Sequence, residues 1–181
     1  MTTHHEKARE ILIAGLRNAH AIETQSVATF GQFEGSLGSY PELQAKLREA
    51  MQTSERQAGR VHTILENMGE SNSSLKDAAL TVMGKMQGMT QMWADDGAIK
   101  ATLASVMGLS MHVSSYDSLL ALAKEAGQEG MNGELEACRN EDKQLFEWFT
   151  DNVESITKRY VQVDLADENG EETPAERRAA S

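Results

Sequence analysis

Hydrophobic positions recur every three or four residues along most of the chain, a spacing that predicts amphipathic α-helices. In the first helix, from about residue 6 to residue 32, the inward face reads Leu12, Leu16, Ala19, Ser26, Phe30 and Phe33, with Leu37 beyond it. This series is complete only if position 23 also faces inward, and Glu23 occupies it. A carboxylate on a buried helix face is costly unless it is paired, hydrogen-bonded or bound to a metal. The pattern therefore predicts polar partners for Glu23 inside the fold.

The same spacing predicts four further helices, separated by short breaks. Ser39 is a candidate cap for the second helix, and Pro41 suits its first turn. Gly-rich or polar sequences such as "GESNSS", "ADDG" and "GQEGMNG" mark the later breaks. The later helices end near residues 68, 92, 126 and 160, and the one ending at 92 begins only at about residue 75.

Four long helices with a short one between the second and third predict an all-α, ferritin-like four-helix bundle. Short turns make two antiparallel hairpins of the long helices, and the short helix is the crossover that joins them. We expect the bundle to cover residues 1–165. Residues 166–181 contain almost no apolar side chains, which predicts a disordered polar tail.

Counting residues from each hairpin turn places several polar side chains near the height of Glu23. Glu55 lies as far after the first turn as Glu23 lies before it, and His112 and Gln144 stand in the same relation about the second turn. Glu141 lies one helical turn from Gln144. Each of these residues, taken singly, also fits a position at the edge of the core from which the polar end of the side chain reaches solvent. Together, one such group from each long helix predicts a metal site in the bundle core, suited to iron, manganese or zinc.

Composition narrows the classes of function. A net charge of −11 argues against non-specific binding to nucleic acid or anionic membranes. A single cysteine, Cys138, excludes an internal disulfide framework and suits a reducing cytoplasm. No apolar run is long enough to cross a bilayer. Motifs for phosphate, dinucleotide or other organic cofactors are missing from the sequence, and no small-molecule substrate is indicated.

With these residues in view, the chain resembles the YciE/YciF family of ferritin-like proteins over about residues 9–162. The likeness rests on "NAHAIETQ", "SERQAGRVHTILE", "HVSSYDSLLALAKEAG" and "NEDKQLFEW", and on the order and spacing of the helices. The resemblance implies a ferritin-like fold, a homodimer and an association with bacterial stress responses.

Ferritin-like di-iron sites take a Glu from two helices and a Glu-x-x-His pair from the other two. In this sequence Glu23 matches one of the single Glu ligands. The two Glu-x-x-His positions hold Gln52 and Glu55 on the second long helix, and Glu141 and Gln144 on the last. On the remaining helix, the acidic positions fall at Leu109 and His112. Amides are weak ligands for iron, and two adjacent metals need bridging carboxylates. We therefore expect a depleted site of Glu23, Glu55, His112 and Glu141 that holds one divalent ion or none, with His20, Gln52 and Gln144 as supporting or alternate groups.

Two functions remain open from the sequence. The first is a cytoplasmic, stress-associated protein that acts by assembly or protection. The second is an enzyme that oxidises iron or consumes peroxide at the residual site.

Other features have plainer explanations. Met83, Met86, Met89 and Met92 spread around half of their helix, which favours packing or a dimer contact with Trp93 over a copper site. His4 follows two threonines at the N-terminus and is a possible copper ligand. Cys138 fits a buried apolar position.

Overall fold

The structure is a computed structural model that describes residues 3–35, 37–70 and 97–169. Four long helices account for most of this part of the chain: α1 (His4–Glu34), α2 (Pro41–Asn67), α4 (Gly97–Glu125) and α5 (Asn132–Asn169), with a 3₁₀ turn, η1 (Glu129–Met131), before α5. They form the all-α bundle predicted from the sequence. The predicted helix at 75–92, with its methionines and Trp93, lies outside the described residues.

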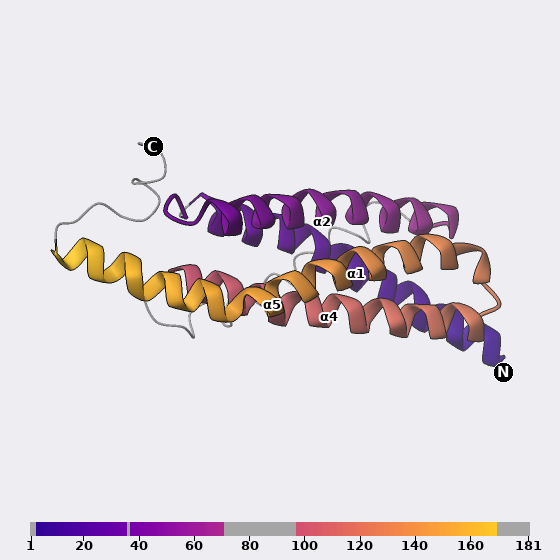
Figure 1. The fold of residues 1–181 in the computed structure, drawn as a ribbon. Helices are drawn as coiled ribbons and strands as arrows, with labels where there is room; N and C mark the ends of the chain where they lie inside the picture. Colours follow the sequence, from indigo (N-terminus) through magenta and orange to yellow (C-terminus); the bar gives the residue numbers. More distant parts are fainter. Residues whose placement is uncertain (1–2, 36, 71–96, 170–181) are drawn as a thin grey trace.

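The helices form two antiparallel hairpins, α1–α2 and α4–α5, whose turns lie at opposite ends of the bundle (Figure 1). Contacts within each hairpin are the most extensive, and α1 against α4 and α2 against α5 close the bundle. None of the helices in the described part is both long and apolar enough to cross a membrane.

Local sequence explains the helix ends. Thr3 caps α1, accepting a hydrogen bond from the Glu6 backbone while the Glu6 side chain accepts one from the Thr3 backbone. The cap of α2 is Tyr40, which makes no side-chain cap bond, so the expectation that Ser39 caps this helix is wrong. Gly69 and Gly127 follow α2 and α4 with φ of 87° and 63°, left-handed conformations that favour glycine at a helix end.

The last helix is longer than the sequence predicts. Residues 166–169 continue α5, and Ala166 is buried. The predicted tail therefore has its first four residues in the helix, and the rest lies outside the described residues.

A polar layer divides the core into two apolar clusters. One cluster, near the α4–α5 turn, includes Leu12, Leu16, Val61, Leu119 and Leu135. The other, toward the α1–α2 turn, includes Phe30, Leu47, Leu109, Leu145 and Phe149. Between them along α1 lie Glu23 and Ser26, and the other helices place buried polar side chains in the same interval: Ser54, Gln57, His112 and Asp142.

Candidate metal centre

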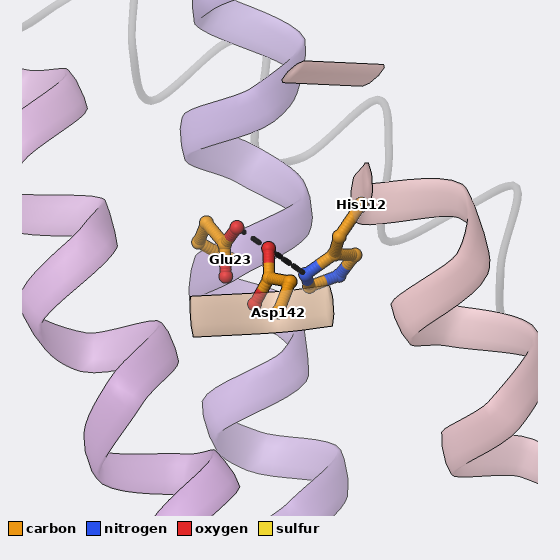
Figure 2. Close-up of side chains that lie close together, drawn as sticks. All are labelled: Glu23, His112 and Asp142. Atoms are coloured by element: carbon orange, nitrogen blue, oxygen red, sulfur yellow. Dashed lines mark ion pairs between the residues drawn. The ribbon is translucent and has the colours of Figure 1, made fainter. Parts of the chain in front are cut away.

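Glu23 of α1, His112 of α4 and Asp142 of α5 meet in this polar layer (Figure 2). Their exposed fractions are 1%, 1% and 0%. His112 Nδ1 lies 3.2 Å from Glu23 Oε1 and 3.6 Å from Asp142 Oδ2. One donor atom from each residue lies within 4.8 Å of the others. Three helices thus direct two carboxylates and one imidazole to a single point.

Two hydroxyl groups hold the cluster in place. Tyr116, one turn after His112 on α4, donates a hydrogen bond to Glu23 Oε1 at 2.9 Å. Ser26, one turn after Glu23 on α1, has its Oγ 3.0 Å from His112 Nε2. A hydrogen bond from Nε2–H to Ser26 leaves Nδ1 as the ring nitrogen that faces the two carboxylates.

Several donor atoms of the cluster are buried without a hydrogen-bond partner in the described part of the chain. They are Glu23 Oε2, His112 Nδ1 and both carboxylate oxygens of Asp142. Buried polar atoms of folded proteins are nearly always satisfied by protein, water or an ion. His112 Nδ1 and Asp142 Oδ2 form ion pairs within the cluster, but none of the four atoms makes a hydrogen bond among the described residues. Four such atoms around one point indicate a site for a metal ion.

The charges of the cluster are strongly coupled. Burial opposes the charge of His112, but the adjacent Glu23 and Asp142 outweigh it and raise the pKa of the imidazole to about 10. The imidazole is therefore protonated at neutral pH when no cation is bound. Burial raises the pKa of Asp142 to about 6 against the stabilising effect of His112. A bound divalent cation would replace the His112 proton as the positive partner of the carboxylates.

The geometry fits one metal ion. Ligand bonds of about 2.0–2.2 Å at roughly right or tetrahedral angles put neighbouring donor atoms about 3–3.5 Å apart. The separations of 3.2 and 3.6 Å from His112 Nδ1 are close to this spacing. One nitrogen and two carboxylate donors suit iron, manganese or zinc.

The residues do not fit a two-metal site. On α2, the buried pair with the spacing of Glu-x-x-His is Ser54 and Gln57, and on α5 it is Asp142 and Leu145. Three of these four positions carry no carboxylate or imidazole. Two ions held about 3.5–4 Å apart require bridging carboxylates and further ligands that this layer does not supply.

Glu55, predicted to face the core, is exposed instead. The inner face of α2 contains Leu47, Ala50, Ser54 and Gln57. Consecutive helix residues differ by about 100° in direction, so Glu55, next to Ser54, points away from this face. Gln52 is exposed for the same reason. The structure therefore separates Glu55 from Glu23 and His112.

Glu141, also predicted as a ligand, is part-buried and bonded elsewhere. Its Oε2 accepts hydrogen bonds from Arg60 at 2.8 Å and Gln57 at 3.1 Å. Burial opposes the negative charge, but these donors lower the pKa of Glu141 below its usual value. Gln144 is exposed. Of the four predicted ligands, the structure brings together Glu23 and His112 only.

Asp142 is the residue that sequence reasoning missed. It belongs to a series of buried positions that recur every seven residues along α5: Leu135, Asp142, Phe149, Ile156 and Val163. Glu141 also lies three residues after Cys138 and four before Leu145, so short-range spacing favoured the wrong member of this acidic pair. The longer series was the signal that distinguishes them.

His20 and Cys138 lie near the cluster without joining it. His20 contacts His62 of α2, with ring centres 5.7 Å apart. Cys138 is 1% exposed, and burial raises the pKa of its thiol to about 11. This thiol is protonated at neutral pH and has the character of a buried apolar side chain.

The chain also matches known proteins. Residues 7–162 match the family described as "Domain of unknown function (DUF892)". The crystal structure of a protein from Xanthomonas campestris pv. campestris superposes on this chain with a TM-score of 0.72 at 19% sequence identity. The superposition covers 88% of this chain and 99% of that one, and it shows a shared ferritin-like fold.

Proposed function

The chain belongs to the DUF892 family, and we propose that it is a ferritin-like protein that holds one divalent metal ion in its core and acts as a structural or protective dimer. The proposed ligands are Glu23, His112 and Asp142. The observation that supports this function is the convergence of three fully buried donor side chains, four of whose donor atoms make no hydrogen bond among the described residues.

A resident ion is favoured on electrostatic grounds. Without it, two carboxylates share one imidazolium, which leaves a net charge of −1 in a layer between two apolar clusters. An uncompensated buried charge is strongly destabilising. A divalent cation, bound once the His112 proton has left, makes the cluster neutral. In this proposal, the metal ion supplies positive charge that stabilises the two buried carboxylates.

The resemblance to the YciE/YciF family supports the biological setting of the proposal. The quoted motifs include the segments that carry Glu23, His112 and Asp142. On this basis we propose a cytoplasmic protein associated with stress, which stabilises or protects through assembly. Iron is the ion that the ferritin-like fold suggests, and manganese and zinc suit the same donors.

The ligand set is tested by binding of Mn²⁺ to metal-free, untagged protein. Asp142→Asn removes a charged donor with little change of shape, so affinity should fall by about 100-fold or more. Glu55→Gln is the matched control, because Glu55 is exposed and outside the cluster. Calorimetric titration measures both variants. Equal loss in the two variants, or loss only in Glu55→Gln, contradicts the proposed site.

An iron-oxidising or peroxide-consuming activity is the alternative, and it has its own test. We expect no sustained turnover of Fe(II) with oxygen or peroxide, because the described residues of the layer lack the ligands for a pair of metals. Oxygen consumption and Fe(III) absorbance measure this activity. Catalytic turnover that Glu23→Ala abolishes would replace the structural function with an enzymatic one.

A further inference from the structure

His20 of α1 and His62 of α2 face one another outside the polar layer. Their ring centres are 5.7 Å apart, and the ring planes are inclined by 41°. Both residues are part-buried, and the side chain of His62 is 33% exposed. The pair is therefore in contact with solvent, in contrast to His112.

This separation matches two imidazoles that share one metal ion. With a metal–nitrogen bond of about 2.0–2.1 Å, each ring centre lies about 3.2 Å from the ion. Two rings at bond angles from 90° to 180° then have centres about 4.5–6.4 Å apart. The observed distance lies within that interval, toward its wider end.

The state of the His20 ring also suits metal binding. His20 Nδ1 is buried and has no hydrogen-bond partner among the described residues. Burial and the neighbouring His62 lower the pKa of His20 despite the opposing charge of Glu23. A neutral imidazole has a free lone pair for a metal ion, as ligation requires.

Glu66 supports His62 from the next turn of α2. Its Oε1 lies 3.2 Å from His62 Nε2, and the i, i+4 spacing places both on one side of the helix. A carboxylate beside one ring nitrogen attracts the proton to that nitrogen and makes the other nitrogen a better ligand. Glu66 therefore favours Nδ1 of His62 as the nitrogen that binds the ion.

We propose that His20 and His62 form a second metal site, separate from Glu23, His112 and Asp142, for a divalent ion of the imidazole-preferring class such as zinc. Water completes the coordination on the exposed side. Glu66 acts as a positioning residue for His62. The site does not depend on whether the core cluster holds a metal.

The test follows the five histidine ring signals by NMR during addition of zinc chloride to metal-free, untagged protein. The Cε1–H signals of His20 and His62 should shift together with one midpoint, while the His112 signal follows binding to the core cluster. In His62→Ala, the His20 response should disappear or move to at least tenfold higher zinc. His5→Ala is the matched control, since His5 contacts Glu125 at the end of the bundle and should leave the pair's response unchanged.

Two results would overturn the second site. One is a His20 signal that responds to zinc equally well without His62. The other is no shift of either signal at millimolar zinc. The His112 signal reports the core cluster in the same spectra, so failure of one site is distinguishable from failure of the other.

Discussion

At the scale of single residues, the buried carboxylate of Glu23 is stabilised by contacts from two other helix positions. Tyr116 donates a hydrogen bond to Oε1, and His112 provides a positive charge 3.2 Å from the same oxygen. Hydrogen bonds to charged groups stabilise more than neutral ones. Asp142 shares the same imidazolium, so the three ionisable groups and Tyr116 act as one unit.

Tyr116→Phe should destabilise the metal-free protein by about 1.5–3 kcal/mol, because it removes a hydrogen bond to a buried charged acceptor. Urea unfolding measures the change. Ser114→Ala is the control, since the exposed Ser114 hydroxyl donates a hydrogen bond to the Ser110 carbonyl of its own helix and lies outside the cluster. A change within about 0.5 kcal/mol of wild type for Tyr116→Phe would show that Glu23 does not depend on this contact.

The raised pKa of His112 gives metal-free protein a definite pH dependence. The folded ring keeps its proton up to about pH 10, whereas the unfolded ring loses it near pH 6.5. The folded state therefore binds more protons between these values, and stability falls as pH rises through the window. We expect a loss of about 1 kcal/mol per pH unit between pH 7 and 8.

Urea unfolding at several pH values in that window measures the slope. His112→Gln removes the titrating group, so its slope should be close to zero. The window stops at pH 8 because an unfolded thiol loses its proton near pH 8.5. Burial raises the pKa values of Cys138 and Tyr116, so both would add to the slope at higher pH. A wild-type stability that is constant or rises across the window would mean that the folded ring is neutral.

At the scale of helices, the phase of each inner face decides which polar residues meet. At the level of the polar layer, α1 and α4 each offer a single candidate ligand with no second candidate beside it in the sequence. Glu23 and His112 were therefore predictable. On α2 and α5, Ser54 with Glu55 and Glu141 with Asp142 are neighbours. A one-residue error rotates a side chain by about 100°, enough to move it from core to solvent. The bundle was therefore more predictable than its site.

Two glycines inside helices should respond differently to replacement by alanine. Gly59 is exposed on α2, and an added methyl group meets nothing within 4 Å. Gly59→Ala should stabilise the protein by about 0.5–1 kcal/mol through helix propensity. At Gly15 of α1, the added carbon would lie 2.9 Å from Leu119 Cδ2 of α4.

Gly15→Ala should therefore stabilise the protein much less than Gly59→Ala, or not at all, because the buried Leu119 must move within a packed core. Thermal and urea unfolding of the two variants make the comparison. Equal stabilisation by both changes would show that α1 and α4 are less tightly packed at this point than the structure indicates.

At the scale of the whole molecule, the polar layer interrupts an otherwise apolar core. A metal ion there would join three of the four helices and stabilise the native state by its binding free energy. Such a layer costs stability when its charges are not balanced. The stability of the native state should therefore depend on whether a metal ion occupies the core.

The proposed dimer is tested by sedimentation velocity of untagged protein across a range of concentrations. We expect a mass near twice the 19.9 kDa of the chain at micromolar concentration. A shift toward monomer on dilution would show a reversible interface. A monomer at every concentration would contradict the assembly part of the proposed function and leave the metal site intact.

Anomalous scattering at the metal edge, from crystals of untagged protein, tests the central claim most directly. The account predicts a single core peak within bonding distance of Glu23, His112 and Asp142. Two core peaks about 3.5–4 Å apart would contradict it, as that is the spacing of a two-metal centre. So would a core that stays empty after soaking in iron, manganese or zinc.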